Sequence, residues 1–249
     1  MGTATTGEKE LGVLLLSAAR HQSTFAEVLS RQPGVRLVAV ADELELVPWV
    51  REANQQLAAK WGLPYLEDVD AALARPDVDI VTIGSEYSRH GPLALKVLQV
   101  GKHVLLDKQP MAMSVEESEA VAAAAREAAA KGIKLGYIHH VVNPTVQRAK
   151  RAIERGEVGE PRAVFVSAIV TYGPGEDPDT SPTSRWGKGL HPQWWNGGEL
   201  IHHGAYAVGV ARYLMGSEIT SVYGVMGGHF NRIHRENGSE DLVTLSVGF

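Results

Sequence analysis

The 249-residue sequence contains no cysteine, which excludes disulfide bonds, thiolate metal sites and a cysteine nucleophile. Any soft metal ligand would therefore have to come from its ten histidines. No apolar run approaches the roughly 18 residues of a membrane span. The formal net charge of -5 gives no basic excess for binding phosphate backbones. We expect a cytoplasmic protein that binds neither membranes nor nucleic acid.

The first half of the sequence alternates short apolar runs with segments of helical periodicity. This alternation is typical of βαβ units and predicts a parallel sheet. The expected strands are 11–16, 35–41, 80–83, 103–106 and 134–138, and the expected helices are 24–31, 50–61, 69–74, 92–100 and 115–131. Residues 1–140 are thus predicted to form an α/β domain with a parallel sheet.

The pattern changes after Pro144. A helix is expected at 145–155 and another over 198–216, with strands at 162–172, 219–226 and 242–249. The stretch 173–189 is rich in Pro, Gly, Asp and Ser and predicts a long loop, which in a compact domain is usually functional or mobile. Residues 141–249 are therefore expected to form a second, α+β domain.

Several motifs follow one another along the chain in a fixed order. They are Val38-Ala39-Val40-Ala41-Asp42, His90-Gly91-Pro92-Leu93-Ala94, Gly101-Lys102-His103-Val104 followed by Asp107-Lys108, Glu154-Arg155-Gly156-Glu157-Val158-Gly159 and Gly197-Gly198-Glu199-Leu200. With them the chain resembles the Gfo/Idh/MocA family of NAD(P)-dependent oxidoreductases. The resemblance implies a Rossmann domain joined to an open-faced, mainly antiparallel α+β domain. It also implies hydride transfer between nicotinamide and a hydroxyl or carbonyl carbon of a sugar, cyclitol or related polyol.

Glycine is missing where a dinucleotide-binding turn would need it. Ser17-Ala18-Ala19 stands in place of G-x-G, where glycine permits a tight turn and close approach to a diphosphate. Serine and alanine are the next smallest residues, so we expect displaced, weaker NAD binding with Arg20 or His21 supplying compensating charge. The residues expected to bind the cofactor are Ser17, Ala19, Arg20, Asp42, Ser85, His90, Asp107 and Lys108.

Asp42 closes an apolar strand 25 residues after Ser17. That is near the spacing of roughly 20 residues expected for the acid that binds the adenosine ribose. A carboxylate there would repel a 2′-phosphate, so Asp42 favours NAD over NADP. An ordinary turn aspartate is the alternative interpretation.

The resemblance implies that Lys108 contacts both the substrate oxygen and the nicotinamide ribose, although a solvated loop lysine is the alternative. By position, the second catalytic pair of the family becomes His202 and Tyr206, and a spacing of four places both on one helical face. Tyr206 is a candidate proton donor or acceptor. His202 replaces the family's aspartate, which leaves the type of chemistry open.

Other candidate substrate contacts are His139 and His140, His203, and the tryptophans Trp186, Trp194 and Trp195. Indole faces with nearby polar groups suit polyols or sugar rings, although an oligomer contact would also favour them. Neither histidine pair has the i, i+4 spacing of a helical zinc site, so we expect no metal site.

Two other functions remain open at this point. One is a non-redox lyase, isomerase or hydrolase on the same scaffold, acting with or without a metal through His139, His140, His202 and Tyr206. The other is a binding protein that has lost catalysis. The chain stops at Phe249 inside an expected strand, whereas the resemblance implies further strands. We therefore expect a shortened second domain and a homo-oligomer that covers the unpaired sheet edge.

Overall fold

The computed structural model describes residues 9–108, 111–169, 198–230, 234–235 and 238–249. The chain divides into two compact units, Met1–Ile138 and His139–Phe249. The expected loop 173–189 and the candidates Trp186, Trp194 and Trp195 lie outside the described residues. Among the described helices, none is both long and apolar enough to cross a bilayer.

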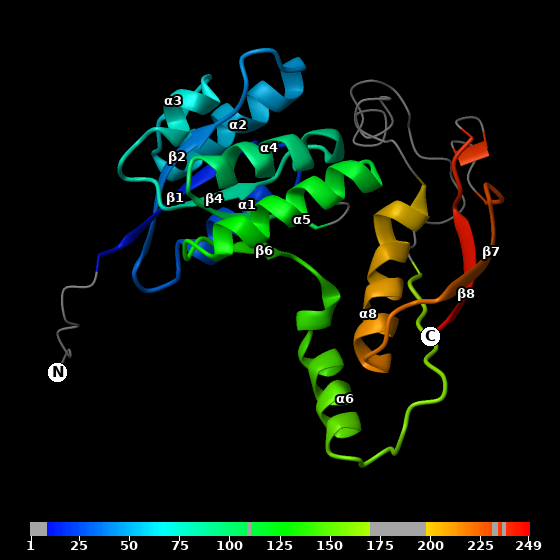
Figure 1. Cartoon of the computed structure of the whole chain (residues 1–249). Coiled ribbons are helices and arrows are strands. Elements are labelled where there is room, and N and C mark those ends of the chain that lie inside the picture. Colours follow the sequence, from blue (N-terminus) through cyan, green and yellow to red (C-terminus); the bar gives the residue numbers. More distant parts are fainter. Residues whose placement is uncertain (1–8, 109–110, 170–197, 231–233, 236–237) are drawn as a thin grey trace. The chain divides into compact units, whose positions relative to one another are not determined.

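The first unit is built on a six-stranded parallel sheet (Figure 1). Its strands are β1 (Leu11–Leu16), β2 (Val35–Ala41), β3 (Tyr65–Leu66), β4 (Ile80–Ile83), β5 (His103–Leu106) and β6 (Leu135–Tyr137). They lie in the order β3-β2-β1-β4-β5-β6, so the chain reverses its direction of travel across the sheet between β1 and β4. In open α/β sheets ligands bind at such a switch point, outside the carboxyl ends of the strands. The predicted Rossmann-type architecture is confirmed.

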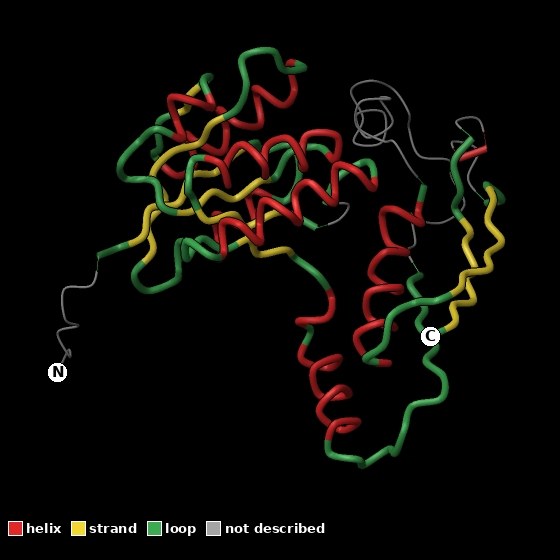
Figure 2. Tube along the Cα trace, in the orientation of Figure 1, coloured by secondary structure: helices red, strands yellow, loops and turns green. Residues whose placement is uncertain are grey.

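Helices cover both faces of this sheet (Figure 2). They are α1 (Gln22–Leu29), α2 (Pro48–Trp61), α3 (Val69–Leu73), α4 (Tyr87–Gln99) and α5 (Val115–Ala129). Val13 and Leu15 of β1 pack in the cluster that includes α1 and α2 residues, while Leu14 and Leu16 pack in the cluster that includes α3, α4 and α5 residues. Successive strand side chains point to opposite faces. A strand covered on both sides therefore has to be apolar throughout, as β1 is.

The described strands and helices of the first unit lie within about two residues of their predicted bounds, with two exceptions. The two-residue strand β3 was missed, because two residues are too few to show a period. Helix α4 begins at Tyr87 rather than at Pro92, which lies inside it. Proline usually marks the first helical turn, and that rule set the predicted start too late.

The second unit contains a short 3-10 turn η1 (His140–Val142), α6 (Pro144–Glu154), a π-helical turn η2 (Leu200–Gly204), α8 (Ala205–Met215) and an antiparallel pair, β7 (Ser221–Gly227) and β8 (Leu242–Gly248). The helix expected over 198–216 is confirmed, with the π turn at its start. The strand expected at 162–172 is wrong, since residues 162–169 are described and form no strand. Alternating apolar residues form a strand only when a neighbouring strand supplies hydrogen bonds.

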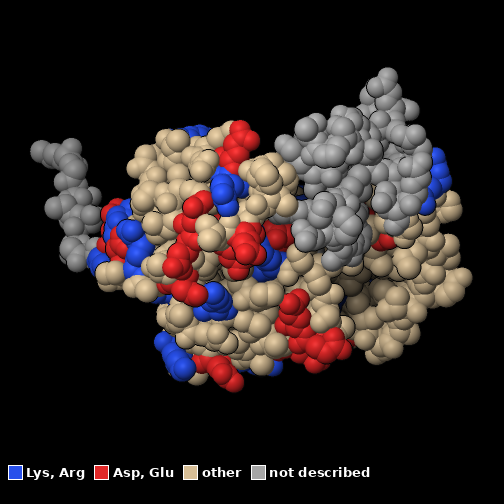
Figure 3. Space-filling view, turned by 90° about the horizontal axis from the view of Figure 1, so that it is seen from above, with Lys and Arg blue, Asp and Glu red and all other residues tan. Residues whose placement is uncertain are grey.

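Acidic and basic side chains are intermixed on the surface visible in Figure 3, rather than gathered into areas of one sign. Many of them form ion pairs across the surface of the first unit, such as Lys9 with Asp79 and Lys96 with Asp70. Exposed pairs of this kind contribute little to stability, about 0–1 kcal/mol each.

Candidate active site

The turn between β1 and α1 keeps the backbone shape of a glycine turn. Among the described residues, Ser17 is the one non-glycine with a positive φ, +64°. Glycine adopts this left-handed conformation readily and other residues at a cost of about 1–2 kcal/mol. Main-chain hydrogen bonds hold the turn on both sides, from the amide of Ser17 to Ala41 and from that of Arg20 to Gly84, each 2.9 Å long. A serine therefore occupies the position and conformation expected of the missing glycine.

The neighbouring strand ends approach this turn closely. A Cβ added to Gly84 would lie 2.9 Å from the carbonyl oxygen of Ser17, so this position has no room for a side chain. The buried Gln22 donates from Nε2 to the carbonyl oxygens of Leu16 (3.2 Å) and Thr82 (2.9 Å). These bonds fix the first turn of α1 against the carboxyl ends of β1 and β4.

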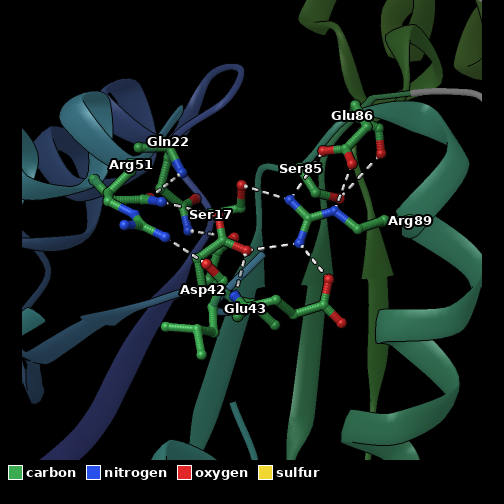
Figure 4. A network of polar contacts seen from close by, with 12 residues as sticks. Ser17, Gln22, Asp42, Glu43, Arg51, Ser85, Glu86 and Arg89 are labelled. Carbon is green, nitrogen blue, oxygen red and sulfur yellow. Dashed lines mark hydrogen bonds and ion pairs between the residues drawn. The ribbon is translucent and has the colours of Figure 1, made fainter. Parts of the chain in front are cut away.

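The Asp42 carboxylate at the end of β2 is fully buried and makes several hydrogen bonds (Figure 4). Its Oδ1 accepts from Arg89 Nη1 at 2.6 Å and from the amide of Glu43 at 2.9 Å, and its Oδ2 accepts from Asn54 Nδ2 at 2.9 Å. Asn54 Oδ1 in turn accepts from the amide of Ala18 at 2.7 Å. Asp42, the acid expected to bind the ribose, is thus linked to the turn through the side-chain amide of Asn54 on α2.

Arg89 of α4 bridges three acids, Asp42, Glu43 and Glu86 (Figure 4). Burial by itself would lower the pKa of Arg89, but its bonds to Glu86 and Asp42 outweigh burial and raise the pKa above the ordinary value. One guanidinium among three carboxylates leaves negative charge in excess at this edge of the sheet. The sequence interpretation missed both Arg89 and Asn54, because neither stands in a recognised motif.

Asp107 and Lys108 follow β5 as expected. The Asp107 side chain is buried, and its Oδ2 lies 2.8 Å from Nδ1 of His21, while its Oδ1 accepts from the amide of Lys108 at 2.7 Å. Burial tends to raise the pKa of Asp107, but the hydrogen bond and charge of His21 hold it below the ordinary value. A charged carboxylate therefore fixes the backbone at Lys108, whose side chain is partly exposed.

Ser85 and His90, two expected cofactor contacts, are fully buried. His90 Nε2 lies 3.1 Å from the carbonyl oxygen of Ser85, and Ser85 Oγ donates to the carbonyl of Glu86 at 3.1 Å. Arg20 donates to the Tyr87 hydroxyl at 2.7 Å, and its guanidinium carbon lies 4.3 Å from the centre of that ring. In this structure these side chains brace the turn between β4 and α4, while Ala19 is half-buried in the turn after β1.

Tyr206 in the second unit lies between two histidines. Its ring stacks on that of His140, with centroids 3.7 Å apart and an interplanar angle of 7°, and meets His139 edge-on at 5.5 Å. His139 Nδ1 accepts from the amide of Val141 at 3.1 Å, and its Nε2 lies 3.4 Å from the carbonyl of Ala205. An accepting Nδ1 places the ring proton on Nε2. These contacts favour a positioning role for His139, and the exposed His140 is the better candidate for a substrate contact.

His202 and His203 lie on the π turn η2, with ring centroids 4.2 Å apart. The carboxylate of Glu199 contacts Nδ1 of His203 and lies 4.0 Å from Nδ1 of His202. The sequence interpretation did not place Glu199 beside these histidines. The spacing E-x-x-H-H would have shown it, because residues three and four apart share a helical face.

Comparison with known proteins identifies both units. A family model described as an oxidoreductase family with an NAD-binding Rossmann fold matches residues 13–137, and one described as a GFO/IDH/MocA C-terminal domain matches residues 146–249. A scyllo-inositol 2-dehydrogenase (NAD(+)) of Bacillus subtilis is 30% identical over 195 residues, which cover 77% of this chain and 50% of that protein. An inositol 2-dehydrogenase of Rhizobium meliloti is 25% identical over 93% of this chain and 63% of its own length.

Among solved structures, GenD2 from gentamicin A biosynthesis in complex with NAD matches with a TM-score of 0.73. It is 23% identical, and the match covers 100% of this chain and 65% of that one. At this identity the likeness shows a shared fold. The chain spans about half to two thirds of the length of these relatives.

Proposed function

Because the chain belongs to the Gfo/Idh/MocA oxidoreductase family, we propose that it transfers a hydride between NAD and a hydroxyl or carbonyl carbon of a sugar, cyclitol or related polyol. The observation that carries this proposal is the left-handed Ser17 in the turn after β1, at the switch point of the sheet. The turn has serine in place of glycine, but its backbone has the left-handed conformation typical of glycine. This is the backbone shape that a diphosphate needs. The inositol dehydrogenases among the relatives support the polyol class.

The residues of the first unit fit NAD with one adjustment. The turn from Ser17 to Arg20 and the start of α1 would hold the diphosphate, since helix N-termini attract anions. Asp42 would bind the ribose hydroxyls, which must share its carboxylate with Arg89 or displace the guanidinium. When bound, the nicotinamide supplies the hydride acceptor or donor.

The remaining steps fall to side chains of this protein. Lys108 polarises the substrate oxygen, and the backbone bond to Asp107 fixes the position from which it acts. Tyr206 relays the hydroxyl proton, and stacking on His140 restricts the orientation of its ring. His202 assists this transfer, since imidazole exchanges protons near neutral pH.

Cofactor preference tests the proposal directly. We expect NAD to bind at least about 30-fold more tightly than NADP, because a 2′-phosphate beside the acids around Arg89 costs about 2 kcal/mol or more. Calorimetric titration of the full chain with both nucleotides measures the ratio. If NAD and NADH fail to bind up to millimolar concentration, the proposal is wrong.

Ser17→Gly is expected to tighten NAD binding by about fivefold, roughly 1 kcal/mol. Removing Cβ lets the backbone approach the diphosphate, and glycine holds the φ of +64° without strain. The matched control is Ser17→Ala, which removes the hydroxyl but keeps Cβ and should not tighten binding. Equal NAD affinities for the two variants would show that Cβ is not the obstacle.

A second candidate function is a non-redox reaction on the same scaffold. It is favoured by the full set of bonds on Asp42, where Arg89, Asn54 and the amide of Glu43 already occupy the carboxylate. Turnover of a polyol or glycoside without added nicotinamide would select this candidate over the first. Strict dependence on added NAD would reject it.

We also propose a cytoplasmic homo-oligomer that associates through the sheet of the second unit. Strand β7 carries four exposed large apolar side chains, Val222, Tyr223, Val225 and Met226. Among the described residues β7 pairs with β8 alone, and an apolar edge strand of this kind is usually covered by a partner. A monomer in solution scattering at micromolar concentration would contradict this.

A further inference from the structure

The π turn at the start of α8 gathers three potential metal ligands. Glu199, His202 and His203 each offer one ligand atom, and the three atoms lie within 4.8 Å of one another. Their side chains are 14%, 16% and 23% exposed, so the cluster is largely enclosed yet still reachable from solvent. We propose that these residues bind a divalent transition-metal cation of the Zn²⁺ class.

Glu240 holds the main chain at Glu199, the carboxylate member of the cluster. Glu240 accepts the amide of Glu199 on its carbonyl oxygen and the amide of Leu200 on Oε1, both at 3.0 Å. A Cβ on Gly198 would lie 2.2 Å from the Glu240 carboxyl, so this close approach requires glycine. Glu199 is thus tied to the loop before β8 as well as to its own helix. These bonds fix the main chain from which the Glu199 side chain extends.

The helical geometry explains why the ligands converge. Residues three and four positions apart lie on the same side of a helix, which brings one glutamate to both histidines. Single π turns are rare and are often found at functional sites. Here the π turn contains both histidines, and Glu199 is its N-cap.

The chemistry of the donor set indicates the cation. Two imidazoles and one carboxylate are the three protein ligands of many catalytic zinc sites, which keep a fourth position for water or substrate. Imidazole ligands favour Zn²⁺ over Mg²⁺ or Ca²⁺, which prefer oxygen ligands. A cation here would offer its open position to a hydroxyl or carbonyl oxygen and polarise it.

The proposal goes beyond the dehydrogenase function, because none of the residues proposed to bind NAD is a ligand of the cation. His202 is common to both proposals, and with a cation bound it would act as a ligand rather than exchange a proton. An ordinary contact between Glu199 and His203 is the competing explanation. A bound cation requires ligand atoms from all three side chains, whereas this contact requires only two of them. The two explanations therefore differ in whether removing any one of the three side chains weakens cation binding.

The test is a Zn²⁺ titration of the full chain, stripped with EDTA, in competition with a chromophoric chelator. We expect one Zn²⁺ per chain, and visible absorption bands when Co²⁺ is added instead. His203→Asn and Glu199→Gln should each weaken Zn²⁺ binding at least about tenfold. Removing a residue that merely hydrogen-bonds to a metal ligand already lowers metal affinity by about this factor. The control His229→Ala removes an exposed histidine of the same unit outside the cluster and should leave binding unchanged.

Two results would overturn the proposal. They are no binding at millimolar Zn²⁺, and ligand variants that bind as the parent chain does. Circular dichroism of each variant verifies its fold, and His202→Gln provides a further test if one variant unfolds. An NAD titration of the EDTA-treated sample separates this proposal from the dehydrogenase function, because either can fail while the other holds.

Discussion

Lys108→Met is expected to lower polyol turnover with NAD by about 10²–10⁴-fold, the usual contribution of a positioned proton-transfer group. The lysine follows β5 at the carboxyl edge of the sheet, and the charged Asp107 beneath it holds the local backbone through the Lys108 amide. Methionine preserves the length of the side chain and removes its charge. Steady-state rates at saturating NAD measure the effect, and they should fall far more than NAD affinity does.

Lys96→Met is the matched control for this substitution. Lys96 also belongs to the first unit, but it is exposed on α4 and pairs with Asp70 at the surface. Its loss should change stability by no more than about 1 kcal/mol and leave turnover unchanged. If the Lys108 variant retained turnover within a factor of three, the lysine would have no part in the chemistry.

Arg89→Leu is expected to lower the free energy of unfolding of the first unit by about 3–5 kcal/mol. Removing one partner of a buried ion pair leaves the other charge without compensation. Asp42 is fully buried, and Glu86 is nearly so, and both would lose their cation. Urea denaturation followed by circular dichroism measures the loss.

The comparison for Arg89 is Arg31→Leu, which removes an exposed i, i+4 pair with Glu27. That change should cost no more than about 0.5 kcal/mol. The double variant Asp42→Asn, Arg89→Leu, compared with both single variants, should recover part of the loss, because it removes a buried charge together with its partner. Losses that simply add in this cycle would show that the two residues are not coupled.

Local features of the sequence predicted much of the fold. β1 is apolar at every position because helices cover both faces of the sheet, and this needs no knowledge of distant contacts. The helix 115–131 is alanine-rich and begins at Ser114, which accepts the amide of Glu117 as the spacing of these two residues predicts. The strand expected at 162–172 could not be decided in this way: residues 162–169 form no strand, and strand formation depends on a partner elsewhere in the chain.

The candidate site was predictable only in part. Asp42, Asp107 and Lys108 lie at strand ends, and the strand pattern placed them there. The sequence could not show that Arg89 pairs with Asp42, which lies 47 positions away. This ion pair joins α4 to the end of β2, so it depends on how the helix packs against the sheet. The stacking of Tyr206 on His140, 66 positions away, is equally invisible in the sequence.

The sequence by itself determined the alternation of strands and helices, the family of the chain and the placement of acids and lysine at strand ends. These properties follow from hydrophobic periodicity and motif order, which are local along the chain. Only the tertiary structure decided that Ser17 takes a glycine conformation, that Arg89 covers Asp42, and that Glu199 meets two histidines. Each of these depends on hydrogen bonds or ion pairs to another element, and a linear pattern does not encode which distant groups will meet.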